Sequence, residues 1–527
     1  MVVVHSDQSL APGQDCLSRL PVELLLRIAR YLETPDLCAV RLCSRSLERA
    51  LHHFFMDGFF RSKQFMLTEF SLQTLLDMAR HPVISQTLRH VSIVLQEFRL
   101  CRRDYPLDTK LAAFLISAVV EQKALMANGL AVQLLAAAFS LLPNLETVQL
   151  CDRHSHTPYS GRQLNAWCCH GLRRLQKQLG WSSNTLLKII CSPGFSSRAF
   201  AIVMMALAQS NARPPNLEVS SRQLNGLYYF AFDLTPAPRL GLHGSGSSGG
   251  DSDMNGKVSA LPVLAGLRRL HLQLRFGFLP PDVNNFGDYF NDRGYTYPAS
   301  VECLSLCAWL AHCSKLGWLR LNMEDEVSVD NNIFLDQLGD PLPDFYPLPA
   351  GLEALRDITL PFASHLRRLD LGKACCYQSV LLNLLRRLPA LEHLTLWRSS
   401  LISVSYSSYP VGTWKGFLRA LAEDRLGKQL KRLSLNRLHA VTLSDTDMSM
   451  QTMRKITLNG RNSIEYKAGV GVSMVSWQQM VSIDYEREIW ETDAVSDSDS
   501  EGIIENDTGS DVHDYESEEE NEGSDRG

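Results

Sequence analysis

Three short stretches of the sequence hold residues whose types and spacing are typical of catalytic or metal-binding sites. GSGSSGG, residues 244–250, fits G-x-G-x-x-G, in which glycines let backbone N–H groups approach a phosphate, and G-x-S-x-G, which presents a nucleophilic serine. Two further groups combine thiols with imidazoles, the side chains that bind zinc. They are Cys168-Cys169-His170 and the set Cys303, Cys307, His312 and Cys313.

The elements around these residues do not suit such chemistry. HGSGSSGGDSDMNG has the composition of a flexible linker, with no strand pattern before it and no helix pattern after it, so Ser248 is not expected to act as a nucleophile. The sequence holds no C-x-x-C pair, and the other spacings do not match zinc modules, so the cysteines are expected to be buried free thiols. We therefore predict a protein that is not an enzyme and has no metal site and no cofactor.

Composition limits the class of protein further. The chain has 527 residues, 45% apolar and 21% charged, which is typical of a soluble globular protein with several domain-sized units. Its longest apolar stretches, 111–120 and 129–142, are separated by charged residues and are shorter than a membrane span. The N-terminus lacks the pattern of a secretory signal, and the 13 cysteines are an odd number. We expect an intracellular protein, cytoplasmic or nuclear, without a membrane or nucleic-acid partner.

Charge divides the chain into two unequal parts. Residues 491–527 contain 15 acidic residues and one basic residue, a charge of -14, and because the whole chain carries -5 the preceding residues carry +9. So polar a segment cannot bury enough apolar surface to fold, and we predict a disordered acidic tail. Such a tail either folds back over the basic face of the repeats and competes with substrate there, or stays solvated and aids solubility.

The N-terminal stretch LSRLPVELLLRIARYLETPDLCAVRLCSRSLERAL, residues 17–51, predicts two or three short helices. Ser18 and Pro21 are typical of a helix start, and Thr34-Pro35-Asp36 repeats that signal for a second helix. Apolar residues recur every four positions along the first helix and so share one face. These residues are Leu20, Leu24, Ile28 and Leu32.

This stretch resembles the F-box family in Leu20-Pro21, Glu23, Ile28, Leu32, Asp36-Leu37 and Cys43-Ser44-Arg45, taken in that order. The resemblance covers roughly residues 16–60, and it lacks the large aromatic residue often found late in the motif. It implies a helical module that binds a Skp-type adaptor and, through it, a cullin ubiquitin ligase. The residues implied in adaptor binding are Leu20, Pro21, Glu23, Leu24, Ile28, Leu32, Leu37, Val40 and Leu47.

Beyond a helix-rich connecting region, 61–140, one formula recurs: an apolar residue, two variable ones, an apolar residue, one variable one, then Leu. Its alternation predicts a strand in each copy, and the segments between copies read as helices or loops. Strands recurring in this way are similar to leucine-rich repeats, and the alternative is an unrelated α/β domain with leucine-rich strands. The copies are LETVQL at 145, LRRLHL at 267, LGWLRL at 316, LRRLDL at 366, LEHLTL at 391, LKRLSL at 430 and MRKITL at 453, with weaker ones at 217 and 301.

Aligning the copies predicts one exposed face. The apolar second and fourth strand positions should point inward, so the residues between them share the other side of the sheet. There they form a basic stripe with two tryptophans, suited to an acidic or phosphorylated peptide, although Arg and Lys also commonly fill solvated strand positions. The predicted substrate-binding residues are Arg269, Trp318, Arg320, Arg368, His393, Trp397, Arg432 and Lys455.

These patterns together predict an α/β protein in which a helical F-box precedes an irregular leucine-rich-repeat solenoid and the acidic tail. The expected units are 16–60, 61–140, a repeat domain 141–460 with a Gly/Ser loop at 241–257, a C-terminal cap 461–490, and the tail 491–527. The arrangement resembles fungal-type F-box and leucine-rich-repeat substrate receptors, which hold a target protein near a Skp–cullin–F-box ligase. The alternative is a scaffold without a ligase role, in which the N-terminal hairpin only caps the repeats.

Overall fold

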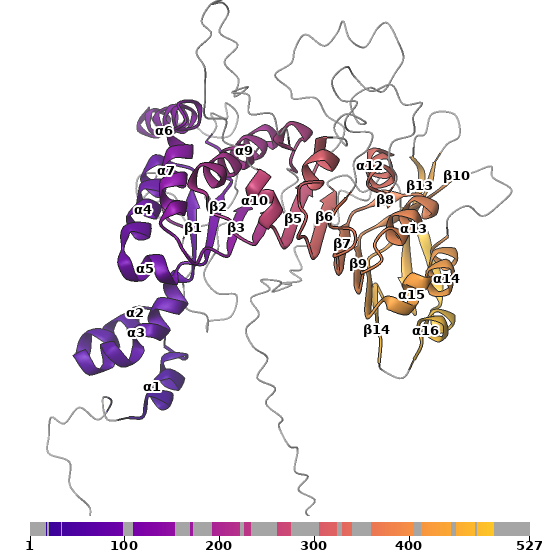
Figure 1. The fold of residues 1–527 in the computed structure, drawn as a ribbon, viewed down its shortest axis with the longest axis horizontal. Helices are drawn as coiled ribbons and strands as arrows, with labels where there is room; N and C mark the ends of the chain where they lie inside the picture. Colours follow the sequence, from indigo (N-terminus) through magenta and orange to yellow (C-terminus); the bar gives the residue numbers. More distant parts are fainter. Residues whose placement is uncertain are drawn as a thin grey trace, which may run out of the picture.

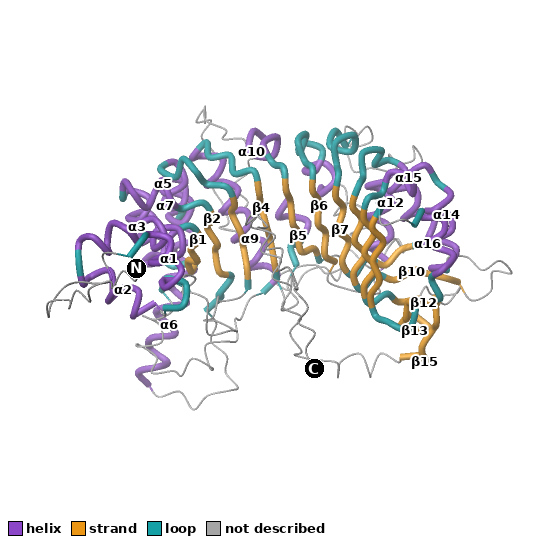
Figure 2. Tube along the Cα trace, turned by 90° about the horizontal axis from the view of Figure 1, so that it is seen from below, coloured by secondary structure: helices purple, strands orange, loops and turns teal. Residues whose placement is uncertain are grey.

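Parallel strands following one another in chain order form the main sheet, which the computed structural model shows as an arch (Figures 1 and 2). Each strand pairs in parallel with the next, except that the last pair, β11 and β14, is antiparallel. The strands are β1 (Ser62–Met66), β2 (His90–Val94), β3 (Thr147–Cys151), β4 (Asn216–Ser220), β5 (Arg269–Leu274), β6 (Trp318–Met323), β7 (Arg368–Gly372), β9 (His393–Trp397), β11 (Arg432–Asn436) and β14 (Ser463–Lys467).

The structure describes most of the chain outside its termini and several loops. The Gly/Ser loop at 241–257 and the tail at 491–527 lie outside the described residues. Those residues are 17, 20–32, 34–98, 109–152, 169–171, 192–221, 226–232, 261–275, 305–323, 329–339, 360–404, 413–443, 450–469 and 472–489.

Helices precede or follow the strands and lie along the outer side of the arch (Figure 1). Three of them, α1, α2 and α3, form a separate N-terminal group at one end of the sheet. The helices are α1 (Val22–Ala29), α2 (Thr34–Cys43), α3 (Arg45–Phe60), α4 (Glu69–Arg80), α5 (Pro82–Thr87), α6 (Thr109–Ala127), α7 (Leu130–Ser140), α9 (Pro193–Ser210), α10 (Leu261–Gly266), α12 (Val329–Gly339), α13 (Gln378–Arg386), α14 (Trp414–Glu423), α15 (Arg425–Gln429) and α16 (Met474–Met480), with a short 3-10 helix at Tyr229–Phe232.

The predicted α/β class, with a helical N-terminal region, is confirmed. Six copies of the formula are strands of the main sheet: those at 145, 267, 316, 366, 391 and 430, and the weaker copy at 217 is β4. Of the weaker copy at 301, only residues 305 and 306 lie within the described part of the chain, and both are helical. The region 61–140 is not purely helical, since it supplies β1 and β2, and the expected cap 461–490 supplies β14 to the same sheet.

A second sheet of five strands is built from the C-terminal part of the chain. MRKITL at 453 lies here, in a strand that pairs antiparallel on both sides, and so does not continue the row of parallel copies. The position expected for Lys455 on the main sheet is therefore wrong. In sheet order the strands are β15 (Ile483–Ile489), β13 (Met450–Leu458), β12 (His439–Leu443), β10 (Ser400–Val404) and β8 (Cys375–Cys376).

Three equivalent corners carry the chain from the first sheet to the second. They lie between β7 and β8, between β9 and β10, and between β11 and β12, and each begins with a residue of positive φ: Lys373 (54°), Arg398 (50°) and Arg437 (49°). Their backbone N–H groups donate to the carbonyl groups of Trp397, Asn436 and Asn462 at 2.7–2.8 Å. This backbone conformation costs a side-chain-bearing residue about 1 kcal/mol or more. We call these three residues the corner row.

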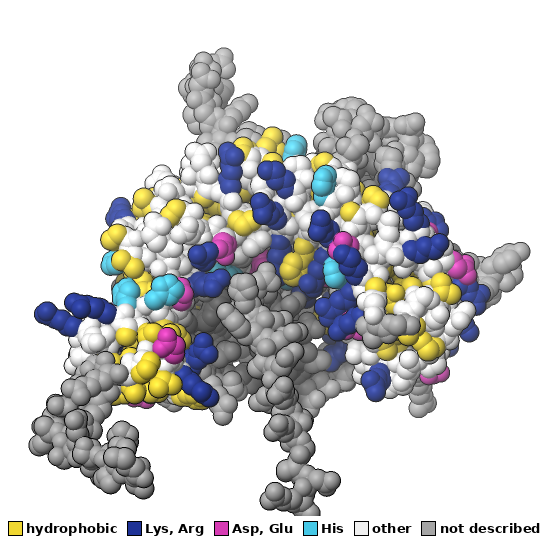
Figure 3. All heavy atoms as spheres, turned by 60° about the horizontal axis from the view of Figure 1, so that its bottom comes forward, with side chains coloured by type: hydrophobic (Ala, Val, Ile, Leu, Met, Phe, Trp, Pro, Cys, Tyr) yellow, Lys and Arg dark blue, Asp and Glu magenta, His cyan; other side chains and the backbone are white. Residues whose placement is uncertain are grey.

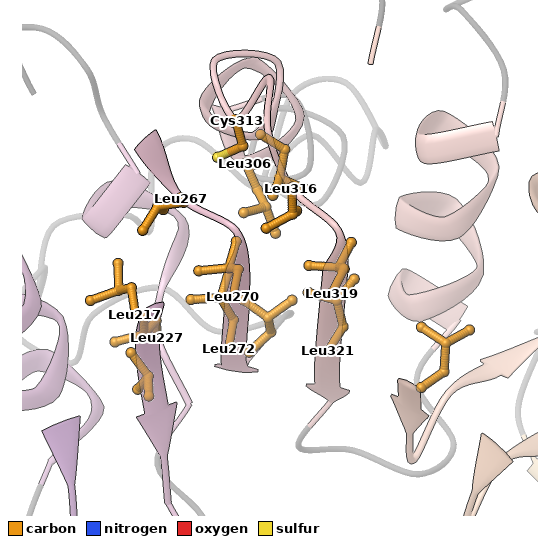
Figure 4. Packing of buried hydrophobic residues seen from close by; sticks show 14 of the residues in the cluster. Leu217, Leu227, Leu267, Leu270, Leu272, Leu306, Cys313, Leu316, Leu319 and Leu321 are labelled. Atoms are coloured by element: carbon orange, nitrogen blue, oxygen red, sulfur yellow. The ribbon is translucent and has the colours of Figure 1, made fainter. Parts of the chain in front are cut away.

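The core lies between the main sheet and its helices. In-register positions of neighbouring strands form columns of buried leucines, such as Leu270 of β5 and Leu319 of β6. Figure 4 shows Leu270, Leu272, Leu319 and Leu321 with Leu306 and Cys313 from the segment that precedes β6. Burying one such side chain contributes about 1.5–3 kcal/mol, so the repeated leucine determines which face of each strand meets the helices. The alternate residues consequently line the opposite, concave face.

The N-terminal helices are joined closely to this sheet. Only Arg61 separates the end of α3 from the start of β1, and its carbonyl accepts hydrogen bonds from the N–H groups of Arg89 (2.9 Å) and His90 (3.0 Å). The Lys63 ammonium lies 5.2 Å from the ring centroid of Phe60 and 5.8 Å from that of Phe59. α3 also packs against α5. The N-terminal helices are thus held at the β1 end of the arch.

Candidate interaction surfaces

Helix α1 carries two apolar stripes, and they have different environments. Leu25 and Ala29 are buried, whereas Leu24 and Ile28, four residues apart, are 46% and 40% exposed, and Tyr31, two residues beyond the end of the helix, is 71% exposed. A helix of 3.6 residues per turn places these two sets on adjacent but distinct faces. One face therefore holds the N-terminal domain together, and the other remains open to solvent.

The buried stripe packs into a small core of its own. α3 begins with Ser44, whose Oγ accepts a hydrogen bond from the N–H of Leu47 (3.2 Å) and so satisfies one free donor of the first turn. Arg41 of α2 forms two hydrogen bonds to Glu48 of α3, at 2.7 and 2.8 Å, while its guanidinium lies 3.5 Å from the Phe55 ring centroid. The core residues are Leu25, Ala29, Leu37, Leu47, Leu51 and Phe59.

The structure divides the nine residues predicted to bind the adaptor. Leu37 and Leu47 belong to the buried core, so their prediction as surface contacts is wrong. Leu20, Leu32 and Val40 are half-buried against that core. Pro21, Glu23, Leu24 and Ile28 are exposed.

Sequence reasoning missed several exposed apolar residues of the same domain. Leu42 of α2 is 87% exposed, and Val22 and Leu17 are each 43% exposed. Figure 3 shows apolar side chains gathered over the end of the molecule that holds these helices. A single exposed leucine is ordinary, but a group of them on a domain of three helices indicates a surface that contacts another protein. The signal in the sequence was an apolar content too high for so small a core.

The concave face of the main sheet is the second candidate surface (Figure 2). The register places five of the predicted residues side by side, at the first position of consecutive strands: Arg269, Trp318, Arg368, His393 and Arg432. The next residue in this row is Lys467 of β14, which occupies the place predicted for Lys455. Arg320 and Trp397 lie further along β6 and β9, on the same face. We call the row of first-position residues, from Arg269 to Lys467, the strand row.

Trp318 is the centre of a closed group of charged residues. The Arg269 and Arg368 guanidinium groups, from the two flanking strands, lie 3.7 and 3.8 Å from its ring centroid. Its Nε1–H donates to Asp370 (2.8 Å), which also pairs with Arg368 (3.0 Å), while Arg269 pairs with Glu218 (3.3 Å). Both arginines thus have carboxylate partners within the face, so the stripe is less basic here than the arginine count indicates.

Deeper on the same face, His271 and Asn322 are buried and hydrogen-bonded, with 3.0 Å between Nε2 and Nδ2. Burial, together with the nearby Arg320 and Arg269, holds the pKa of His271 well below its usual range. A neutral imidazole can accept the amide proton of Asn322. This pair therefore adds a structural contact and no positive charge.

The β9–β14 end of the face is more exposed. Arg432 and Lys467 both pair with Glu465, Lys467 at 3.1 Å. Burial alone would raise the pKa of Glu465, but the hydrogen bonds from Arg432 and Lys467 outweigh it and lower that pKa. Burial and the neighbouring Arg368 lower the pKa of His393. Two cations thus share one carboxylate here. Figure 3 shows basic side chains near the middle of the molecule with acidic ones among them.

The thiol and imidazole groups that were considered as metal ligands are buried or packed against neighbouring side chains where the structure describes them. Burial raises the pKa of Cys307 and of Cys313 to about 12, which disfavours the thiolate that binds a metal. His170 stacks on Phe65 and bridges to β1. Among the residues that the structure describes, no group of three His, Cys, Asp or Glu side chains is placed to hold a metal ion. Cys168, Cys303 and Ser248 lie outside them.

Within the described ranges, no single helix is long and apolar enough to cross a membrane. One pair, Ile116–Ala127 with Leu130–Ser140, passes on length and composition but is bent by 67°.

Comparison with known proteins gives one result that bears on the N-terminal helices. The F-box-like family model matches residues 17–55, which cover α1, α2 and most of α3. This segment is thus an F-box-like domain, as the resemblance predicted, and the finding supports an F-box protein. F-box domains typically bind Skp-type adaptors, and the open stripe of α1 lies within the matched residues. A search of curated proteins finds no match to the chain.

Proposed function

We propose that this protein is the substrate-recognition subunit of a Skp–cullin–F-box ubiquitin ligase. The observation that carries the proposal is the set of exposed apolar residues on the F-box-like domain: Leu24, Ile28, Tyr31 and Leu42. The core of that domain forms without these side chains, so they are not needed for its folding. Burying exposed apolar side chains against a partner is favourable in proportion to the apolar area removed from water. The proposed partner for them is a Skp-type adaptor, and through it a cullin.

The concave face is the proposed site for the target protein. Successive parallel strands with leucines on the helix side support the interpretation of this region as an irregular leucine-rich repeat of the fungal type. The spacing between consecutive strands varies from 25 residues, between Arg368 and His393, to 69, between Thr147 and Asn216. Such curved sheets offer a long surface for a protein partner.

In this proposal the chain itself performs no chemistry. It holds a target close to the ubiquitin-carrying subunits, which raises the effective concentration of the reacting groups. Two of the cysteines considered as metal ligands support the absence of a catalytic role, because Cys307 and Cys313 are buried thiols in the core. We also propose an intracellular location, because the described cysteines are free thiols.

One observation favours a second candidate, a scaffold whose N-terminal helices only cap the sheet. α3 packs against α5 and β1, and Lys63 lies near two of its phenylalanines, as a structural cap would require. A structural cap, however, would not require exposed apolar side chains on α1. The two candidate functions therefore differ in whether these side chains bind an adaptor.

Adaptor capture by purified variants distinguishes them. Replacing Leu24 and Ile28 by serine removes two exposed anchors without touching the core, and we expect a loss of about 2 kcal/mol or more per anchor in adaptor binding. The control replaces Leu141 and Val475, which are 42% and 43% exposed and lie outside the F-box-like domain and the helix α5 that packs against it. Equal adaptor capture by the L24S/I28S variant and the L141S/V475S variant would reject the ligase role.

A further inference from the structure

We propose that the corner row, Lys373, Arg398 and Arg437, binds an Asp/Glu-rich segment of a partner protein, with Trp397 as the adjoining apolar contact. This inference rests on the proposed function and names the class of target segment it would recognise. It places the acidic contact at the carboxyl ends of β7, β9 and β11, and not at the arginines of the strand row near Trp318.

The arginines beside Trp318 are already paired with carboxylates. Arg269 and Arg368 each have a carboxylate within the face, and Asp370, one of these carboxylates, is buried. An incoming acidic side chain would have to displace Glu218 or Asp370 from groups that also contact the Trp318 ring. Removing one partner of such a network leaves a desolvated charge behind, which is unfavourable. The Trp318 group is therefore a poor site for an acidic ligand.

The members of the corner row are closely spaced. Its members follow directly after Gly372, Trp397 and Asn436, which are paired in register on consecutive parallel strands. Neighbouring strands lie about 4.8 Å apart, so the three backbones fall within about 10 Å. An extended peptide covers that distance in roughly three residues. A short acidic segment is thus long enough to span the three positions.

The residue types of the corner row are unusual for its backbone conformation. Glycine and asparagine adopt positive φ most readily, and Asn459, which follows β13, is an example at 53°. The corner row uses Lys and Arg at φ values of 49° to 54° instead. The geometry of the corner alone does not account for three cationic side chains there. Strained positions of this kind are concentrated at functional sites.

The surroundings complete the site. The Arg398 guanidinium lies 5.7 Å from the Trp397 ring centroid, which places a half-buried aromatic ring beside the row. Arg437 is exposed, and its side chain has no hydrogen bond or ion pair with any residue that the structure describes. Aromatic and arginine residues together are typical of the centre of protein interfaces. Three cations form too short a row for a nucleic-acid backbone, which proteins usually contact through more phosphates.

The test measures binding of the full-length chain to a fluorescent peptide of alternating Asp and Glu, with an Asn/Gln peptide as the neutral control. Arg398→Asn with Arg437→Asn removes two charges and places at both positions a residue that tolerates positive φ. We expect about tenfold weaker binding at about 0.1 M salt, a smaller difference at about 1 M, and an unchanged or higher melting temperature. The matched control, Lys415→Gln with Arg419→Gln, removes two exposed charges from α14 and should change the affinity less than about twofold.

Three outcomes would overturn the inference. They are equal peptide binding by the R398N/R437N variant, a larger loss from Arg269→Gln with Arg368→Gln, and tighter binding of a single-stranded oligonucleotide that depends on the same residues. Adaptor capture is measured on every variant and should not change, since the F-box-like domain is intact in each. A chain that captures the adaptor but fails to bind the acidic peptide rejects this inference alone.

Discussion

The indole ring of Trp397 lies over the backbone of Gly372 on the neighbouring strand. A Cβ added at Gly372 would lie 3.3 Å from Cε3 of Trp397 and 2.3 Å from Oδ1 of Asn322, its partner on the other side. The glycine therefore leaves room for side chains from both flanking strands. It allows the aromatic ring of Trp397 to approach the backbone of Gly372 beside the corner row.

Gly372→Ala should destabilise the protein by about 1–3 kcal/mol, because the new methyl group requires Asn322 or Trp397 to move. Displacing Asn322 also breaks its hydrogen bond to His271. Thermal unfolding followed by tryptophan fluorescence measures the effect. Gly194→Ala is the control, because no atom lies within 4 Å of its added Cβ, and it should cause no loss. Equal melting temperatures for both variants would contradict the close packing at Gly372.

Trp318 should contribute to stability in two separable ways. Trp318→Phe keeps an aromatic ring beside Arg269 and Arg368 but removes the hydrogen bond to Asp370, at an expected cost of about 1–3 kcal/mol. Trp318→Ala removes the ring as well and should cost about 1 kcal/mol or more beyond that, from the two cation–π contacts. Urea unfolding of the two variants measures the difference. The interpretation fails if the alanine variant is as stable as the phenylalanine one.

Stability should fall in mild acid because of histidines whose pKa values are lowered in the folded state. Burial is the main cause that lowers the pKa of His90 to about 4, so the folded state takes up its proton only below the usual value of 6.5. Between those values the unfolded state binds more protons, and unfolding becomes easier as the pH falls. His90 alone should cost up to about 1.4 kcal/mol per pH unit, on the order of 3 kcal/mol over the window.

His90→Asn should therefore flatten the dependence of unfolding free energy on pH between about 4 and 6.5. Other buried histidines such as His271 leave a residual slope. His53→Gln changes an exposed histidine and is the control, with no expected effect on the slope. An unchanged slope in the His90 variant would show that this residue is not the source.

The acidic tail should compete for the corner row. Residues 491–527 carry -14 and are tethered to the body, so even weak attraction to Arg398 and Arg437 gains from a high effective concentration. A chain ending at Trp490 should bind the Asp/Glu peptide more tightly than the full chain at about 0.1 M salt, and the difference should shrink at about 1 M. A chain with a neutral tail of equal length separates charge from bulk. Equal affinities at low salt would exclude competition.

The sequence predicted the strands of the main sheet well where leucine marked them. Alternation with a period of two fixes both the strand and its buried face, so Arg269, Trp318, Arg368, His393 and Arg432 were assigned to one row correctly. The same alternation in MRKITL gave the wrong sheet for Lys455. An apolar pattern records which side of a strand is buried, but it does not record which strand lies beside it.

Two other errors have the same origin in contacts between distant residues. β1 and β2 were missed because SKQFM and HVSIV lack the leucine formula, and Lys63 interrupts the apolar alternation. In the F-box-like domain, Leu37 and Leu47 share the leucine-rich composition of the open stripe, and only the packing of α2 against α3 shows that they are core. The charge balance of the concave face was also hidden, since Glu465 comes from the antiparallel strand β14.

The single residue between α3 and β1 has a mechanical consequence. With Arg61 as the whole connection, and with its carbonyl bound by two backbone N–H groups, the F-box-like domain has no swinging linker. A flexible linker would let a bound target take many positions relative to the F-box-like domain. This short connection instead fixes both the distance and the orientation of the target relative to that domain. In the proposed ligase, an acceptor lysine would then be selected by where it sits on the target surface, and lysines outside a narrow zone would go unmodified however tightly the target is held.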